Sequence, residues 1–315
     1  MRNKKLLSLL VSAILFLAIF FVFFLFLPRE PLGGRGVFVV VKESSPEDIT
    51  SKLYSQGFIR SPFIFSLFWK DKTNISPGGY TLSRGMTYWQ VAKVFRDEPS
   101  DVWILIPEGL RKEETAEILN RKLNWSVNSK EEFLQDSREG YMFPDTYLLP
   151  RDFSGKEAAK KMLRNYEEKI FSLSAEILKK NISQDKLITL ASLVQREAAN
   201  SEEMPFIASV LWNRLSAGYP LQIDAALQYA IGKPGNFWPK ITKEDYHSIK
   251  SPYNTYLNRG EPPFPICSPG LLAIKAVLSP QKTSYLFYFH DNNGKVYFSD
   301  TFQEHSRKIR QFLKK

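Results

Sequence analysis

The sequence predicts an α+β protein in three parts: an N-terminal transmembrane helix, a small α+β module and a larger α+β domain. The first observation behind this prediction is one long uncharged segment near the N-terminus. The second is that short β-rich runs alternate with capped amphipathic helices, and the third is that this pattern restarts after residue 99. We therefore expect a tail at 1–5, a membrane span at 6–27, the small module at 36–99 and the larger domain at 103–315.

The apolar segment Leu6–Leu27 contains no charged residue. As a helix its twenty-two residues reach about 33 Å, which is enough to cross a bilayer core. A signal peptide has a shorter apolar region followed by a small-residue cleavage site, whereas Pro28 and Arg29 follow directly here. Because Arg2, Lys4 and Lys5 precede the segment, we expect a single-pass anchor with a cytoplasmic N-terminus.

Charge and composition exclude several classes of function. The formal net charge is +10, and about +7 remains when the N-terminal tail is left out. This charge suits binding to an anionic polymer or surface, but it equally fits a basic face that only contacts solvent. These basic residues are expected outside the cytoplasm, so nucleic acid is not an expected partner. The single cysteine, Cys267, cannot form an internal disulfide. The three histidines have no metal-site spacing, and neither a phosphate-binding glycine loop nor a GxSxG elbow occurs, so no metal or cofactor is predicted.

The small module begins with a β-rich run at 36–42. Ser45, followed by a proline and two acids, predicts a helix start. A second helix is expected at 60–70, then a turn into a strand from 76–80 and a helix opened by Thr87. We expect the aromatic residues of this module to form its core.

The larger domain is expected to open with a strand at Trp103–Pro107, followed by a helix to about Lys122. The aromatic run Glu139–Tyr147 is too broken for a plain strand, and is read either as a surface loop or as the wall of a groove. Periodicity predicts one long helix over Gly155–Asn181.

The next helix, expected over Lys186–Ala199, carries the principal candidate residue. Glu197 falls on the same apolar face as Leu190, Leu193 and Val194. A carboxylate on such a face either pairs, takes up a proton or lines a cleft, and a raised pKa is what a general acid needs near neutral pH. Three interpretations of Glu197 remain open here: a catalytic role, a buried structural carboxylate, or a helix end at which the periodicity no longer holds.

Further candidates follow in the chain. Asn200 or Ser201 is expected to cap a helix that Gly218 ends. Asp224 either caps a helix over 225–231 or belongs to a site, and Gln222, two residues earlier on an extended stretch, would point the same way.

The proline-rich stretch Ser251–Gly270 can be neither helix nor regular sheet. As a rigid loop that carries Tyr253, Asn254 and Tyr256, it suits sugar, because rings stack on pyranose faces and amides pair with hydroxyls. The remaining elements are expected to be a helix at 271–278, a buried strand at 285–290 paired in a hairpin with 296–299, and a helix at 304–315.

Together these runs resemble the YceG-like family of endolytic murein transglycosylases, bacterial membrane-anchored enzymes that cut peptidoglycan. The matching runs are EGYMFPDTY (139–147), LASLVQREA (190–198), NRL (213–215), LQID (221–224), YNTY (253–256), GEPPFPICSPG (260–270) and FSDTFQEH (298–305). The resemblance implies that Glu197 is the catalytic acid and that 36–99 is LysM-like. It also implies a bacterial inner-membrane location, glycan strands as substrate and wall-synthesis enzymes as possible partners.

Several substrate-binding assignments rest on the motifs alone. Glu139, Tyr141 and Asn213 are assigned in this way, and a structural role is equally open for each. The chain departs from the family where Gln195 replaces the first acid of the LAS motif, which leaves Glu197 as the candidate. Further substitutions fall in the proline loop and near the C-terminus, at Glu261, Phe264, Ser268, Val296 and Ser306.

The predicted chemistry is non-hydrolytic cleavage of the bond between N-acetylmuramic acid and N-acetylglucosamine, with formation of a 1,6-anhydro ring. Glu197 would serve as acid and then as base, and the amides of Gln222 and Asn254 would stabilise the charge on the sugar. One alternative is a hydrolase that uses Asp224 as a second carboxylate. The other is a non-catalytic wall-binding scaffold.

Overall fold

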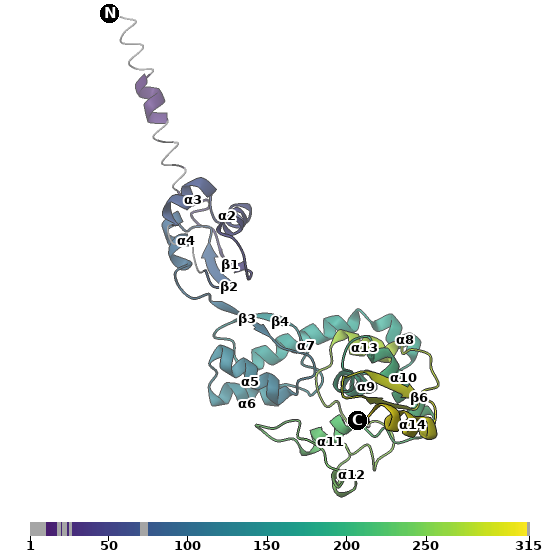
Figure 1. Cartoon of the computed structure of the whole chain (residues 1–315). Coiled ribbons are helices and arrows are strands. Elements are labelled where there is room, and N and C mark those ends of the chain that lie inside the picture. Colours follow the sequence, from purple (N-terminus) through teal and green to yellow (C-terminus); the bar gives the residue numbers. More distant parts are fainter. Residues whose placement is uncertain (1–10, 18–19, 21–23, 25–26, 70–74, 314–315) are drawn as a thin grey trace, which may run out of the picture. The chain divides into compact units, whose positions relative to one another are not determined.

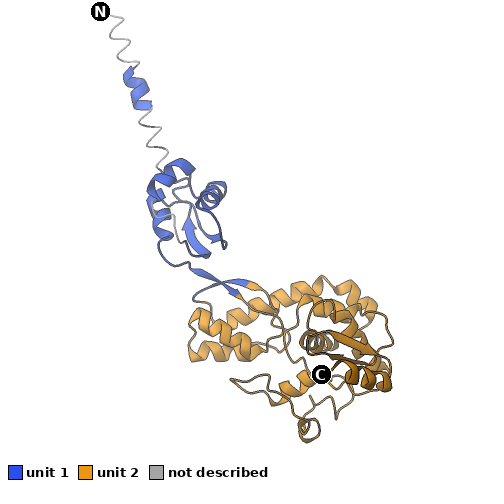
Figure 2. Cartoon of the chain, in the orientation of Figure 1, with its two compact units in different colours: residues 1–104, 147–152 blue, residues 105–146, 153–315 orange. Residues whose placement is uncertain are grey.

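The computed structural model describes residues 11–17, 20, 24, 27–69 and 75–313 (Figure 1). The chain forms two compact units, which Figure 2 colours separately: unit 1 is 1–104 with 147–152, and unit 2 is 105–146 with 153–315. In the described ranges, no helix is both long and apolar enough to cross a membrane. Most of the predicted span, Leu6–Leu27, lies outside those ranges.

Unit 1 contains a sheet whose strands lie in chain order. These are β1 (Arg35–Val40), β2 (Gly78–Ser83), β3 (Asp101–Leu105) and β4 (Thr146–Pro150). Its helices are α2 (Pro46–Ser55), α3 (Pro62–Phe68) and α4 (Tyr88–Val94). Ser45 and Thr87 cap α2 and α4 through capping boxes, as the sequence predicted.

The core of unit 1 is aromatic. Phe38, Phe65 and Tyr80 are fully or almost fully buried, and Phe38 and Tyr80 both pack against the ring of Phe95. Tyr54, Phe63 and Trp89 are exceptions, since their side chains are exposed, and the Arg96 guanidinium lies over the Trp89 ring. The expectation that these aromatics form a core is therefore confirmed for the buried rings.

The strand expected to open the larger domain pairs instead with β2, where Gly79 lies opposite Asp101. Residues 101–104 consequently group with unit 1, together with 147–152 from β4. A strand belongs to the sheet that satisfies its backbone hydrogen bonds, and the sequence does not identify that partner. The compact units thus differ from the predicted limits 36–99 and 103–315.

Unit 2 is mostly helical. Its helices are α5 (Lys112–Leu123), α6 (Val127–Asp136), α7 (Gly155–Phe171), α8 (Ser174–Lys180), α9 (Gln184–Glu197), α10 (Met204–Ser216), α11 (Asp224–Ile231), α12 (Asp245–Ser248), α13 (Leu271–Leu278) and α14 (Phe302–Phe312). The hairpin of β5 (Phe287–His290) and β6 (Val296–Ser299) pairs as predicted, although β5 is half-buried rather than buried.

Two helix predictions were wrong. The single helix expected over 155–181 breaks after α7 at Leu173, whose backbone leaves helical geometry and whose side chain is buried. The helix expected directly after residue 200 begins only at Met204. Asn200 Oδ1 accepts from the backbone of Glu202 and Glu203, so these residues form a turn before α10.

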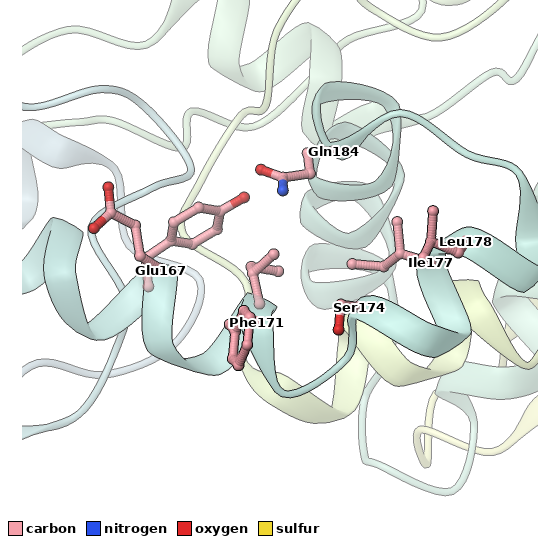
Figure 3. Close-up of a pocket in the computed structure, with 8 residues that line it drawn as sticks. Glu167, Phe171, Ser174, Ile177, Leu178 and Gln184 are labelled. Atoms are coloured by element: carbon pink, nitrogen blue, oxygen red, sulfur yellow. The ribbon is translucent and has the colours of Figure 1, made fainter.

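Helix α9 lies at the centre of unit 2 and packs against α10, α11 and α13. Every residue from Leu187 to Val194 is buried, so the helix is enclosed on all sides rather than along the one face that periodicity predicted. An apolar pocket of about 380 Å³ lies near its first turn, between α7 and α8, and is lined by Phe171, Ile177 and Gln184 among others (Figure 3). Since Gln184 begins α9 and Glu197 ends it, this pocket is about 20 Å along the helix from Glu197.

Gly155 allows α6 and α7 to approach closely. A Cβ added there would lie 1.7 Å from the Ser129 carbonyl oxygen, a clash that only backbone movement can relieve. We expect Gly155→Ala to destabilise unit 2 by about 2 kcal/mol or more, measured as the free energy of unfolding in denaturant. Gly34→Ala, where an added Cβ meets nothing, should stay within about 0.5 kcal/mol of wild type. Equal stability of the two variants would contradict the packing argument.

Candidate active site

Glu197 is the last residue of α9, where the chain leaves the helix in an extended conformation at Ala198. The enclosed apolar part of α9 therefore ends directly at the carboxyl. Glu197 is partly exposed, whereas Val194, one turn earlier, is fully buried. The side chain thus sits at the boundary between the core and the surface.

Two donors hold the Glu197 carboxyl. The Tyr288 hydroxyl donates to Oε2 at 2.8 Å, and the backbone N–H of Ala225 in the first turn of α11 also donates to it. Burial raises the pKa of Glu197, and the negative charge of Asp224 adds to this; the two hydrogen bonds and His290 act in the opposite direction without cancelling it. The site therefore favours a protonated Glu197.

Tyr288 is a site residue that sequence reasoning missed. It lies on β5 two residues before His290, so the two side chains share one face of the strand. His290 Nε2 lies 2.9 Å from Glu203 Oε2, and that carboxyl also accepts from the backbone of Ala199. Alternation in the run YLFYFH was the available signal, but the sequence does not say which element the strand faces.

Arg214 is a buried cation in the same region. Its guanidinium donates to the carbonyls of Leu221 and Leu286, each at 2.6 Å, and to Gln222 Oε1 at 3.3 Å. Burial lowers the pKa of Arg214. Arg214 thus ties the start of the hairpin to the chain before α11.

Asp224 is exposed and faces two tyrosines. The Tyr256 hydroxyl donates to Oδ1 at 2.5 Å and the Tyr246 hydroxyl to Oδ2 at 3.5 Å, and the two rings stack with centroids 4.2 Å apart. Asp224 is the first residue of α11 and makes no capping bond, so the capping interpretation was wrong. Its charge acts on Glu197, which brings Asp224 and Tyr256 into the candidate site.

Gln222 also lies in this region, but not for the predicted reason. Its φ of +54° places it in the left-handed region, so the alternation of an extended strand does not apply. The Arg214 bond holds its side chain instead.

Two other predicted contact residues have their amides occupied by backbone. Asn254 is fully buried, donating to the carbonyls of Tyr246 and Ile249 and accepting from the N–H of Tyr256. Asn213 donates to the carbonyls of Thr283 and Tyr285. Both side chains support loops, and their contact with substrate stays a prediction.

Of the other predicted residues, Tyr141 contacts α9 far from Glu197, whereas Glu139 and Tyr253 lie together in a second cluster. The Tyr141 hydroxyl donates to Asp185, twelve residues before Glu197 on α9 and so about 18 Å distant along the helix. Glu139 is buried, accepts from the Lys112 N–H at 3.2 Å and lies 3.4 Å from the Tyr229 hydroxyl. The Tyr229 ring packs against Tyr253, which places Tyr253 in the same cluster.

Helix α9 also holds the proline loop. Ser192 Oγ accepts from the Ile266 N–H at 3.1 Å, and Gln195 Oε1 accepts from the Gly270 N–H at 2.9 Å. Gln195, which replaces the first acid of the LAS motif, thus holds the proline loop through this hydrogen bond. Across the described ranges, no three His, Cys, Asp or Glu side chains gather as a metal ion would require.

Fold and site together define a two-unit α+β protein with a carboxyl whose pKa is raised and which accepts a hydrogen bond from a tyrosine hydroxyl. The profile of the YceG-like family matches residues 38–311, and the chain belongs to that family. It is 37% identical over 176 residues to the endolytic murein transglycosylase of Bacillus subtilis, covering 56% of this chain and 48% of that protein. It is 28% identical to the enzyme of the same name from Streptococcus pneumoniae D39, covering 91% of this chain and 60% of that protein.

The chain therefore spans about half to three-fifths of the length of these relatives. A crystal structure of a yceG-like protein from Listeria monocytogenes superposes with a TM-score of 0.59 at 28% identity. That match covers 88% of this chain and 99% of the other.

The buried Glu139 gives the stability a pH dependence. Burial, with the nearby charge of Glu113, raises the pKa of Glu139 from 4.5 to about 8. Between pH 4.5 and about pH 8, Glu139 keeps a proton in the folded protein and releases it in the unfolded chain. The free energy of unfolding therefore falls as the pH rises through this range. We expect Glu139→Gln to flatten this fall by on the order of 1–3 kcal/mol between about pH 5 and about pH 9, measured by denaturant unfolding. The exposed Glu132→Gln should keep the wild-type slope, and parallel curves for all three proteins would refute the assignment.

Proposed function

We propose that the chain is a membrane-anchored endolytic lytic transglycosylase. It cleaves the β-1,4 bond between N-acetylmuramic acid and N-acetylglucosamine within peptidoglycan strands and leaves 1,6-anhydro-N-acetylmuramic acid ends. The observation that carries the proposal is the raised pKa of Glu197 beside the Tyr288 hydroxyl. The names of the Bacillus and Streptococcus relatives support it.

In the first step the protonated Glu197 gives its proton to the glycosidic oxygen as the bond from that oxygen to C1 of the muramoyl sugar breaks. In the second step the carboxylate takes the proton of the C6 hydroxyl, whose oxygen bonds to C1 and closes the anhydro ring. The acid is restored, no water is consumed, and one carboxyl serves both steps.

Positive charge develops on the sugar between these steps. The carboxylate of Asp224 stabilises this positive charge. Hydrogen bonds from Tyr256 and Tyr246 orient that carboxylate beside Glu197. The buried Asn254 amide does not take this role, since its bonds are made to the loop. The stacked Tyr246 and Tyr256 rings suit the apolar face of a sugar.

The wider setting belongs to the same proposal. The uncharged run Leu6–Leu27 anchors the chain in the bacterial inner membrane, and the rest acts on the wall outside the cytoplasm. A LysM-like module at 36–99 holds the glycan. The enzyme trims or terminates nascent strands, with wall-synthesis enzymes as partners.

A second candidate is a peptidoglycan hydrolase in which Asp224 activates water. The observation that favours it is the electrostatic influence of Asp224 on Glu197, which places two carboxyls near each other as glycoside hydrolysis requires. The non-catalytic scaffold has no such observation in its favour.

Removal of the acid separates the enzyme from the scaffold. We expect Glu197→Gln to keep the fold and to lose about 10²–10⁴-fold in glycan cleavage, because the amide has no proton to give. The exposed Glu202→Gln, five residues away, is the matched control and should cleave like wild type. Undiminished cleavage by Glu197→Gln would exclude this site.

Mass spectrometry of the same digests separates the two enzymes. Anhydro ends, lighter than reducing ends by one water, are the expected product. If only reducing ends appear, the hydrolase is correct and the transglycosylase is not.

Tyr288 is expected to set both the position and the pKa of the acid. Its hydroxyl bond stabilises the Glu197 carboxylate, so Tyr288→Phe should raise the pKa of Glu197 further. We expect the basic limb of the pH–rate profile to move to higher pH and the maximal rate to fall about tenfold. Tyr285→Phe is the control, since the structure gives the Tyr285 hydroxyl no hydrogen bond to any described residue. A lower rate with an unmoved basic limb would argue against this role.

A further inference from the structure

A second pocket in unit 2, of about 740 Å³, has no role in the chemistry described so far. We call it the α14 pocket. Three chain segments line it: the stretch before α11, the start of β5 and the start of α14. The lining residues that matter below are Tyr219, Gln222, Phe287, Thr301, Phe302 and Gln303.

The α14 pocket adjoins the acid through a short piece of chain. Gln222 lines the pocket, and the N–H of Ala225, three residues later, donates to Glu197. Three residues span at most about 11 Å between Cα atoms, so a ligand in the pocket lies next to the site of Glu197. One extended chain molecule can occupy both.

Arg214 braces the pocket wall. Its guanidinium bonds to Gln222 Oε1 and to the Leu286 carbonyl, and it lies over the Phe287 ring at 5.2 Å. Because Arg214 is only 8% exposed, this part of the wall is fixed from behind. The pocket is built before a ligand arrives.

The lining combines ring faces with neutral polar groups. Tyr219 is 47% exposed and Phe302 is 64% exposed, so both rings are open to a ligand. Gln222, Gln303 and Thr301 supply amides and a hydroxyl beside them. Asp300 is the one ionisable acid in the lining and disfavours an anion. The chemistry suits a neutral polar ligand with apolar faces, which describes N-acetylglucosamine, whereas N-acetylmuramic acid without a stem peptide carries a lactyl carboxylate.

We propose that the α14 pocket binds an N-acetylglucosamine residue of a glycan strand that continues past the bond at Glu197. The inference rests on the proposed function and deepens it. The strand would lie on the stacked Tyr246 and Tyr256 rings at one side of Gln222 and in the pocket at the other. Cleavage then falls within a strand, because sugars are held on both sides of the bond.

The test uses the full chain carrying Glu197→Gln, so that bound strands persist. The probes are soluble strands of alternating N-acetylglucosamine and N-acetylmuramic acid without stem peptides, in a series of increasing length, and calorimetry gives Kd. In this background we expect Phe302→Ala to weaken binding of long strands about five- to tenfold and to leave the shortest strands unchanged. Gln303→Ala should act in the same direction, and Phe171→Ala, an exposed phenylalanine on α7, is the matched control.

The outcomes are distinguishable. Loss of affinity that grows with strand length in both α14-pocket variants supports the proposal. Equal Kd values for parent and variants, or losses that ignore strand length, overturn it and leave the role of Glu197 intact. Circular dichroism checks that Phe302→Ala is folded. If it is not, the affinities of Gln303→Ala alone decide between these outcomes. Continued cleavage by the Glu197→Gln parent would instead refute the proposed function.

Discussion

The rest of the site depends on the desolvation of one carboxyl at the end of a buried helix. From Leu187 to Val194, α9 is enclosed by protein, and Glu197 follows within a turn. An ionised carboxylate is unfavourable there, and the Tyr288 hydroxyl and Ala225 N–H only partly offset that cost. The raised pKa of Glu197 therefore results from the position of α9 in the fold. The neighbouring groups adjust that tendency without reversing it.

The same helix also positions the parts that surround the acid. Ser192 and Gln195 fix the proline loop by its backbone, so the loop is rigid at the points where α9 holds it. Helix α11 contacts both Glu197 and Glu139. The N–H of Ala225 bonds to Glu197, and the hydroxyl of Tyr229, about one turn later, lies near Glu139. Few elements thus set the geometry of many side chains, as a preorganised site requires.

The polar side chains near the site divide by how far they are exposed. The amides of Asn254 and Asn213 bond to backbone carbonyls and keep loops in place. Gln222 and Asp224 are exposed, although their oxygens accept from Arg214 and Tyr256. Sequence motifs do not separate these two groups, because a residue that shapes a loop and a residue that contacts a ligand leave the same trace in a motif. Exposure in the folded chain does separate them.

The sequence by itself determined what depends on neighbours along the chain: the caps at Ser45 and Thr87, the helix at 271–278, the hairpin, and Glu197 on an apolar helix. Such features arise from local hydrogen bonding and periodicity. Only the tertiary structure decided that β3 pairs with β2, that α7 and α8 are separate, and that Tyr288 meets Glu197 across ninety-one positions. These facts depend on which distant group satisfies a backbone bond or a buried carboxyl, and that choice is made by packing.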